Sequence, residues 1–230
     1  MRTLLAPSPL APGPVILTDD EARHALTVLR MEVGDQVRLA DGAGRAGVGT
    51  ISAADRRSLT IELVTVEVLP VDPAALITVA VAAPKGDRLG DLVRMLTELG
   101  VGTIQPLICA RGERVPSNLE RLTRISAEAL KQCRRGTLPI LAAPCSIADL
   151  AASGECLIVL DPNGLPAQPG SPAPVTLVIG PEGGLTEAES ALLAQAGAHS
   201  IRLAGPILRI ETAAVAAAAV WAAQWTVPKR

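Results

Sequence analysis

The five residues Gly180-Pro181-Glu182-Gly183-Gly184 form the segment of this chain best suited to hold a ligand. They follow the apolar run 175–179, and Thr186 with Glu189 three residues later predicts a capped helix start directly after them. Glycines at such a point let the backbone approach a ligand closely. A tight turn between a strand and a helix needs the same residue types, so this segment alone leaves both interpretations open.

Two other segments place charges beside very apolar residues. Arg209 and Glu211 flank Ile210 where the segment 203–213 passes from a strand through a loop into a helix. They suit either a functional pair at the helix start or an ordinary surface ion pair. The third segment begins with Lys85-Gly86-Asp87-Arg88 and continues into an apolar helix that carries Glu98 near its end.

A glycine motif in the first part of the chain is interpreted as a hairpin. Residues 42–47 match G-x-G-x-x-G, which in a dinucleotide site opens a helix so that the helix N-terminus meets the pyrophosphate. Here the motif is followed by Val48-Gly49-Thr50-Ile51, which is typical of a strand. The pattern therefore predicts a turn between two β-strands.

The elements that must position these residues fall into two domains. Residues 1–70 are predicted to form a small β-rich domain, with a helix at 19–30 capped by Thr18 and strands at 36–40, 47–51 and 59–68. Residues 74–230 alternate apolar strands with helices, which indicates a largely parallel sheet covered by helices. The strands are expected at 76–83, 103–109, 156–160, 175–179 and 200–203, and the helices at 87–99, 118–134, 186–196 and 211–225.

Parallel sheets bind ligands in loops beyond the carboxyl ends of their strands. The loops after Leu160, Ile179 and Leu203 are therefore the candidate site. The Pro- and Gly-rich stretch 161–174 is expected to be a surface loop.

Composition narrows the class of protein. Of the 230 residues, 49% are hydrophobic and 1% are aromatic, so aliphatic side chains must fill the core and aromatic stacking cannot be the main means of binding bases. Scattered cysteines (Cys109, Cys133, Cys145 and Cys156) and only two histidines argue against a metal site and favour a reducing compartment. Four prolines interrupt the N-terminal apolar stretch, and no apolar run suits a bilayer span, so we expect a cytoplasmic protein without membrane contact.

The net charge of −2 does not by itself indicate a nucleic-acid partner. Residues 85–135, however, carry ten Lys or Arg against six Asp or Glu. A basic segment of this kind suits a surface that faces phosphates. Charge alone favours the simpler interpretation, which is two solvated helix faces.

Taken as an ordered set, the residues resemble the bacterial 16S ribosomal RNA uridine-N3 methyltransferases of the SPOUT (α/β-knot) superfamily. The similarity covers nearly the whole chain. The Gly-Pro-Glu-Gly-Gly turn is more widespread in the superfamily, whereas the complete set is specific. The matching residues are Arg2, His24, Val28-Leu29-Arg30, Gly34-Asp35, Asp41-Gly42, Gly44, Lys85, Thr97-Glu98-Leu99-Gly100-Val101, Arg111, Glu128-Ala129, Gln132, Arg135, the turn 180–184, Leu208-Arg209 and Glu211-Thr212-Ala213.

The resemblance implies an α/β fold with a trefoil-knotted SPOUT domain and a PUA-like N-terminal domain for RNA. It also implies a homodimer that binds S-adenosylmethionine in the knot and completes each active site across the interface. The cofactor-binding residues would be Leu160, Pro162, Gly180, Glu182, Gly183, Leu203, Gly205, Ile207, Leu208 and Thr212. The residues expected to contact RNA are Arg2, Arg23, His24, Arg30, Lys85, Arg111 and Arg135.

The implied reaction is methylation of the N3 of a uridine in 16S ribosomal RNA, within the small ribosomal subunit. The enzyme must align methyl group and nucleophile and help to remove the N3 proton. We hypothesise that Arg209 stabilises the uracil anion and that Glu211 orients the base or takes the proton. A helix N-terminus also favours glutamate for structural reasons alone.

Two departures from the family pattern bear on the substrate. Met95 stands where the family usually has a lysine, although Arg94 is adjacent, and Pro206 stands where it usually has an arginine. Both changes remove a cation near the expected RNA surface and leave the cofactor loop intact.

Two alternatives to the implied reaction stay open. One is the same fold acting on a ribose 2′-hydroxyl of transfer RNA. The other is a non-catalytic RNA-binding assembly factor.

The C-terminal helix suggests where two copies meet. It is rich in alanine, and Trp221 and Trp225 lie on one face. Two large aromatic side chains exceed what a contact within one chain needs, so this helix is predicted to lie at or beside a twofold interface.

Overall fold

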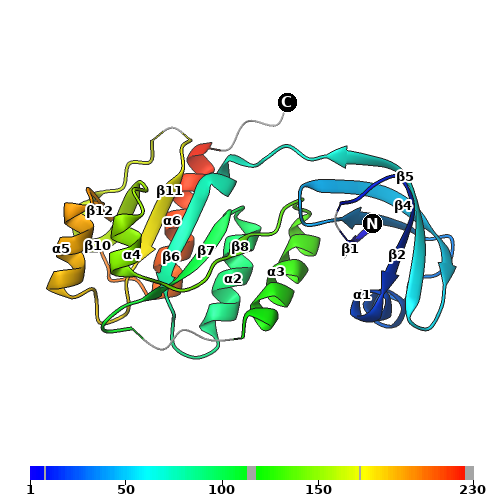
Figure 1. Cartoon of the computed structure of the whole chain (residues 1–230), viewed down its shortest axis with the longest axis horizontal. Coiled ribbons are helices and arrows are strands. Elements are labelled where there is room, and N and C mark those ends of the chain that lie inside the picture. Colours follow the sequence, from blue (N-terminus) through cyan, green and yellow to red (C-terminus); the bar gives the residue numbers. More distant parts are fainter. Residues whose placement is uncertain (8, 113–117, 171, 226–230) are drawn as a thin grey trace. The chain divides into compact units, whose positions relative to one another are not determined.

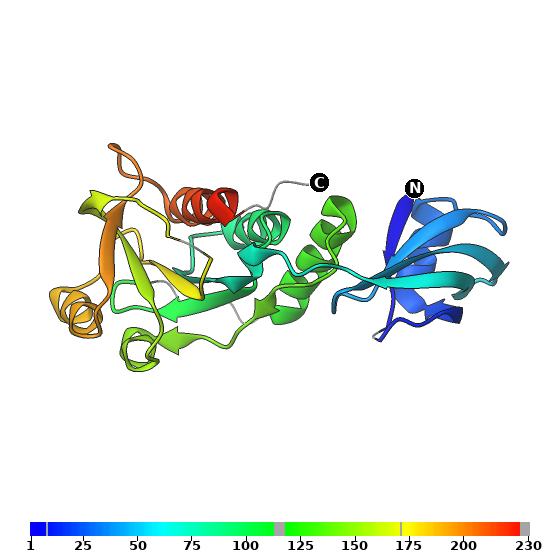
Figure 2. The same cartoon turned by 90° about the horizontal axis from the view of Figure 1, so that it is seen from above.

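The computed structural model describes residues 1–7, 9–112, 118–170 and 172–225. The chain divides into two compact units, which are considered separately (Figures 1 and 2). The first unit is Met1–Val71 with Ala127–Leu138, and the second is Asp72–Ser126 with Pro139–Arg230. Helix α3 (Leu119–Cys133) therefore begins in the second unit and ends in the first, a return that the sequence pattern did not predict.

The first unit is built on a five-stranded mixed sheet in the order β1-β3-β4-β5-β2. Strand β1 runs parallel to β3, and the other pairings are antiparallel. Its core consists of aliphatic side chains, as the composition predicted, and Leu39, Ile51 and Leu59 are almost completely buried. The strands are β1 (Arg2–Leu5), β2 (Gly13–Thr18), β3 (Gln36–Ala40), β4 (Arg45–Ala54) and β5 (Ser58–Val68).

The glycine motif forms the β3–β4 turn and is not a helix start, so the predicted hairpin is confirmed. The Asp41 carboxylate accepts hydrogen bonds from the backbone N–H groups of Ala43 (2.8 Å) and Arg45 (2.9 Å). Gly42 and Gly44 have φ values of 69° and 104°, which other residues rarely adopt. The motif is needed to reverse the chain.

The predicted helix at 19–30 is shorter than expected. Thr18 is its N-cap residue, as predicted, but the Thr18 side chain makes no capping hydrogen bond. It consists of α1 (Asp19–Arg23) and a π-helical turn η1 (His24–Val28). Asp19 has a left-handed backbone (φ 54°), and the Thr18 hydroxyl donates a 3.0 Å hydrogen bond to the Asp19 carboxylate. The Thr18 side chain therefore caps no N–H group of the first turn.

The end of α3 is fastened to the first unit by an ion pair. The Lys131 side chain is only 7% exposed. Its ammonium group lies 3.2 and 3.1 Å from the two carboxylate oxygens of Glu21. The same carboxylate accepts a hydrogen bond from the N–H of Leu5 (2.9 Å). Leu130 packs beside this pair against Ala40 and Ala46. The segment 127–138 thus belongs to the core of this unit.

The second unit is built on a parallel sheet in the order β12-β10-β11-β6-β7-β8, and β9 also pairs with β7. This confirms the predicted sheet type. The strands are β6 (Ile77–Ala82), β7 (Thr103–Ile108), β8 (Ile140–Leu141), β9 (Cys145–Ser146), β10 (Leu157–Pro166), β11 (Val175–Ile179) and β12 (His199–Arg202). A 3-10 turn, η2 (Pro73–Leu76), leads into β6.

Helices cover both faces of this sheet (Figure 2). The sheet is buried on both sides because its strands are apolar at successive positions: Val79 and Val81 face one core cluster, and Ala80 and Ala82 face the other. The first cluster includes residues of α2 (Arg88–Glu98) and α6 (Ile210–Trp225). The second includes residues of α4 (Ile147–Ala152) and α5 (Glu187–Gln195).

The stretch 161–174 is not entirely a surface loop, which corrects the prediction. Strand β10 continues to Pro166, and Leu160 and Leu165 both pair with Ile201, so residues 161–164 form a bulge between them. A Cβ at Gly164 would lie 2.6 Å from the backbone of Ile201. Glycine therefore allows this strand to return to β12 after the bulge.

The two tryptophans do not form an exposed aromatic face, which removes the reason given for placing them at an interface. Trp221 and Trp225 are 3% and 4% exposed and belong to the core cluster of the second unit. The indole N–H of Trp225 donates to the carbonyl of Gly170 at 2.8 Å. Both large side chains are therefore buried within one chain.

Candidate functional site

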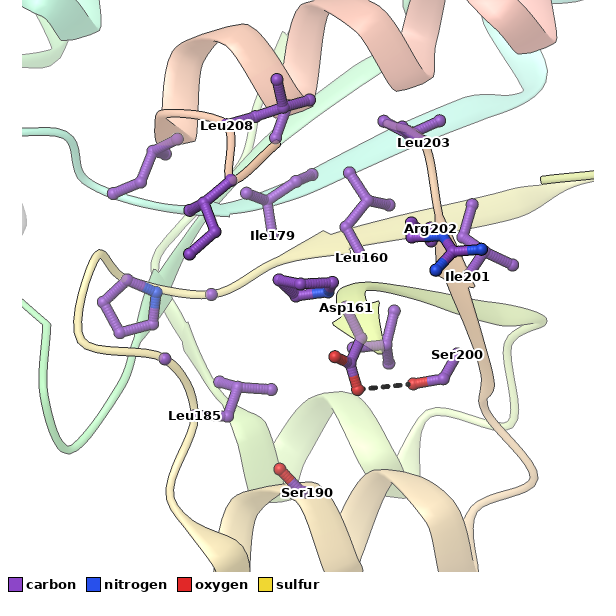
Figure 3. Close-up of a pocket in the computed structure, with 18 of the residues that line it drawn as sticks. Leu160, Asp161, Ile179, Leu185, Ser190, Ser200, Ile201, Arg202, Leu203 and Leu208 are labelled. Carbon is purple, nitrogen blue, oxygen red and sulfur yellow. Dashed lines mark hydrogen bonds between the residues drawn. The ribbon is translucent and has the colours of Figure 1, made fainter. Parts of the chain in front are cut away.

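A cavity of about 560 Å³ lies in the second unit, where the ends of β11 and β12 meet the bulge of β10 (Figure 3). Apolar side chains, among them Leu160, Ile179, Leu203 and Leu208, surround it. The cavity is thus formed by the loops after Leu160, Ile179 and Leu203, which the sequence predicted as the candidate site because ligands bind beyond the carboxyl ends of parallel strands. An apolar cavity of this size at such a position is typical of a small-molecule site.

The Gly-Pro-Glu-Gly-Gly segment forms one wall as a tight turn between β11 and α5. The N–H of Gly184 donates to the carbonyl of Pro181 (2.8 Å), and Gly184 has a φ of 70°. The predicted capping box is confirmed, because the Thr186 hydroxyl accepts from the N–H of Glu189, whose carboxylate accepts from the N–H of Thr186. The turn is thus both a strand-to-helix connection and a wall of the cavity.

A neighbouring loop after β7 holds this turn in place. The Arg111 guanidinium donates to the carbonyl of Gly183 (3.0 Å), and the N–H of Ala110 donates to the Glu189 carboxylate (2.8 Å). Desolvation favours a higher pKa for Glu189, but hydrogen bonds from Thr186 and Ala110 outweigh it and keep the pKa below its usual value. Glu189 therefore joins two loops as an anion.

Two of the polar side chains in the cavity, Asp161 and Ser200, come from the bulge of β10 and from β12. The Asp161 carboxylate accepts a hydrogen bond from the Ser200 hydroxyl at 3.4 Å (Figure 3). It also accepts a hydrogen bond from the backbone N–H of Asn163 at 2.8 Å. Sequence reasoning missed Asp161, Ser200 and Ser190, which also lines the cavity. The bulge that presents Asp161 depends on the pairing of β10 with β12, which the local sequence does not specify.

Glu211, a predicted catalytic residue, is ion-paired at the start of α6. Its carboxylate accepts from the Arg88 guanidinium at 3.0 Å, and its side chain is 14% exposed. Desolvation favours a higher pKa, but the helix N–H and Arg88 outweigh it, and the pKa of Glu211 lies below its usual value. Arg209, the other predicted catalytic residue, is exposed, and its side chain does not line the cavity.

Most of the predicted cofactor residues lie together. Gly205 is exposed in the loop that lines the cavity but is not itself among the lining residues, and Thr212 is exposed on α6. The predicted residues that do line the cavity are Leu160, Pro162, Gly180, Glu182, Gly183, Leu203, Ile207 and Leu208. Pro206, one of the two departures from the family pattern, lines it as well.

The predicted RNA-contacting residues are divided between the units. Lys85 and Arg111 belong to the second unit, where Lys85 lies 3.7 Å from Glu182 and Arg111 binds Gly183, so both adjoin the cavity. In the first unit, Arg2 and Arg30 are exposed. Arg23 pairs with Asp20 (2.7 Å), Arg135 donates to the Thr137 hydroxyl (3.4 Å), and His24 is half-buried in η1.

Among the described residues, no helix is long and apolar enough to cross a membrane. The four cysteines are free thiols. Burial, which is the main cause, raises the pKa of Cys109 to about 11, so this thiol is protonated at neutral pH.

Comparison with known families agrees with this architecture. The sequence model of an RNA methyltransferase domain matches residues 72–222, and that of an RNA methyltransferase PUA domain matches residues 17–64. The fold and the cavity thus define an RNA methyltransferase domain joined to a PUA-like domain.

Individual relatives narrow the family. The chain is 33% identical to ribosomal RNA small subunit methyltransferase E of Synechocystis sp., with 95% of this chain and 76% of the relative covered, and 34% identical to that of Mycobacterium bovis, with 89% and 85% covered. The crystal structure of the Neisseria gonorrhoeae protein of this name, bound to S-adenosyl methionine, matches 98% of both chains with 28% identity and a TM-score of 0.88. The chain belongs to the ribosomal RNA small subunit methyltransferase E family, so the family resemblance is confirmed.

Proposed function

We propose that this protein transfers a methyl group from S-adenosylmethionine to the N3 of a uridine in 16S ribosomal RNA. The observation that carries the proposal is the cavity formed by the loops of β10, β11 and β12 in a chain of this family. The related structure with S-adenosyl methionine bound supports the choice of cofactor.

The residues of the cavity fit this cofactor. Leu160, Leu203 and Leu208 offer an apolar surface for an adenine ring. The carboxylate of Asp161 suits a ligand that carries hydroxyl donors and positive charge, whereas the carboxylate of Glu182 is already paired with Arg88 and Lys85. When bound, the cofactor supplies an electrophilic methyl group on a sulfonium, so the protein must exclude water and orient the nucleophile. No metal is needed for this chemistry.

Arg209 and Glu211 remain the proposed catalytic residues, with more specific roles. Arg209 is exposed and suits contact with the uracil anion. Glu211 is held as an anion by Arg88, and a carboxylate whose pKa is lowered is a weak proton acceptor. We therefore assign Glu211 to orienting the base and not to removing its proton.

The remaining proposals concern RNA, assembly and location. The PUA-like unit with Arg2, Arg23, His24, Arg30 and Arg135 would bind RNA, and the proposed RNA contacts of the second unit are Lys85 and Arg111. A trefoil knot at the cofactor loops, a homodimer that completes each site, action on the small subunit and a cytoplasmic location all follow from the family resemblance. Light scattering that reports a monomer at micromolar concentration would contradict the dimer.

The test uses small ribosomal subunits that lack the modification. Incubation with labelled S-adenosylmethionine should label 16S ribosomal RNA, and mass spectrometry of the digested RNA should place the methyl group on N3 of uridine. A parallel incubation with transfer RNA tests the alternative reaction of the same fold, and a methyl group on a ribose 2′-hydroxyl there would favour that alternative instead. Absence of cofactor binding in calorimetry would favour a non-catalytic assembly factor.

A further inference from the structure

One guanidinium connects two walls of the cavity. Arg88, the first residue of α2, donates from Nη2 to the Glu182 carboxylate at 3.2 Å. From Nη1 it donates to both carboxylate oxygens of Glu211, at 3.0 and 3.4 Å. Glu182 lies in the turn after β11, and Glu211 lies in the first turn of α6.

The orientation of this guanidinium is fixed by a third contact. Its Nε donates to the carbonyl of Lys85 at 2.9 Å, so all three nitrogen atoms of the group are engaged. The Arg88 side chain is 31% exposed, and the Lys85 ammonium adds a weaker contact to Glu182 at 3.7 Å. A group so fully used is poorly placed to bind an RNA phosphate, and its position suits a structural task in the site.

Both anchored glutamates adjoin the surface of the cavity. Glu182 itself lines it, and Glu211 is the neighbour of Ile210, which also lines it. Without a cation between them, two carboxylates that share this position would repel each other, and the turn would move away from the helix start.

We propose that Arg88 is a positioning residue of the cofactor site, which sets the distance between the Gly-Pro-Glu-Gly-Gly turn and the start of α6. This proposal rests on the assignment of the cavity to S-adenosylmethionine. It requires an arginine, because a planar fork can bind two carboxylates at once, whereas the ammonium of a lysine is a single compact charge.

The main test compares Arg88→Met with Arg94→Met. Arg94 lies on the same helix and also pairs with carboxylates, Glu98 at 2.9 Å and Asp91 at 4.0 Å, but both belong to α2 itself. Calorimetry should show S-adenosylmethionine binding weakened about tenfold in Arg88→Met and by less than about twofold in Arg94→Met. Equal losses in the two variants would overturn the proposal.

A double-mutant cycle tests the connection itself. Glu182→Gln should weaken cofactor binding in the unmodified protein but have almost no further effect in Arg88→Met. Additive losses would contradict a shared role. Glu182 is 41% exposed, so Glu182→Gln should fold. If Arg88→Met folds poorly, cofactor affinity in Glu182→Gln alone still shows whether the Glu182 end of this connection matters.

Kinetics separate positioning from a general loss of structure. With small subunits as substrate, Arg88→Met should raise the KM for S-adenosylmethionine more than it lowers kcat, and Arg88→Lys should recover only part of the loss. Equal loss in kcat and kcat/KM would instead assign Arg88 to the reaction itself and overturn the positioning role.

Failure of the proposed function would be recognised separately. If the unmodified protein binds no S-adenosylmethionine, the cofactor assignment fails, and hydrogen exchange then decides the role of Arg88. Backbone amides at 182–184 and 211–213 should exchange faster in Arg88→Met than in Arg94→Met. Identical exchange in the two variants would overturn the positioning role.

Discussion

At the scale of single residues, the adjacent glycines Gly183 and Gly184 of the turn differ in what an added side chain would meet. A Cβ at Gly183 would meet only Arg111 atoms at 3.6 Å, which is ordinary contact, and its backbone does not have a positive φ. Gly184, in contrast, has a φ of 70°, where side chains cause strain. The two neighbours should therefore fail for different reasons when they are replaced.

Gly183→Val should strongly weaken cofactor binding and leave the fold intact, because Gly183 lines the cavity and the substitution adds a branched side chain there. We expect S-adenosylmethionine affinity to fall more than about tenfold. Gly184→Ala should instead lower the free energy of unfolding by about 1 kcal/mol. Calorimetry and thermal unfolding measure the two effects, and unchanged affinity in Gly183→Val would show that the turn is structural only.

At the scale of elements, the start of α5 connects the turn to the loop after β7 through one carboxylate. Oε1 of Glu189 accepts from Ala110, and Oε2 accepts from the N–H and hydroxyl of Thr186. A glutamine has only one acceptor oxygen, so it can keep one of these connections and not both. The helix start thus depends on the ionised form.

Glu189→Gln should lower the free energy of unfolding by about 1 kcal/mol at neutral pH, as expected for a lost cap. The pKa of Glu189 is lowered in the folded protein from its ordinary 4.5. The stabilisation is therefore fully present above pH 4.5 and is lost as the pH falls through the folded pKa. In denaturant titrations, the free energy of unfolding of Glu189→Gln should fall less steeply as the pH is lowered than that of the control Glu187→Gln. The control replaces an exposed carboxylate in the same helix turn. Identical acid profiles would contradict this role.

At the scale of the whole molecule, each unit has its own hydrophobic core, and the tryptophans belong to one of them. Trp221 and Trp225 fill the core of the second unit beside β6 and β11. If the protein forms a dimer, its interface cannot depend on these two side chains in the way the sequence suggested. Their removal should act on folding first and on activity as a consequence.

Trp221→Ala should lower the free energy of unfolding by about 3–5 kcal/mol, the cost of a cavity left by a large buried side chain. Val220→Ala on the exposed side of the same helix should change it by less than about 0.5 kcal/mol. Chemical denaturation measures both. A Trp221→Ala protein with unchanged stability but altered oligomeric state would restore the interface interpretation.

RNA binding should weaken steeply with salt, because cations that contact phosphates release counterions. Replacing Arg30 with Gln should reduce the slope of log K against log salt by about 1. Arg56→Gln, an exposed arginine outside the predicted contact set, should leave the slope unchanged. A flat salt dependence of the unmodified protein would count against a phosphate-binding surface.

The sequence by itself determined the class of sheet, the family and most of the site. Apolar runs and helical periods located the five predicted strands and the four predicted helices of the second domain, because burial on both faces of a parallel sheet demands such runs. The cap at Thr186 and the hairpin at Asp41 were also predictable, since their hydrogen bonds join residues within a few positions.

Only the tertiary structure decided the features that depend on contacts between distant segments. The bulge that presents Asp161 follows from pairing with β12, the burial of the tryptophans follows from the packing of α6, and the return of 127–138 to the first unit depends on Lys131 and Glu21. In the sequence, Arg88 is a charge in the first turn of a predicted helix, and folding brings it to glutamates 94 and 123 residues away. Local patterns reflect local hydrogen bonds and burial, whereas such partners are chosen by the fold as a whole.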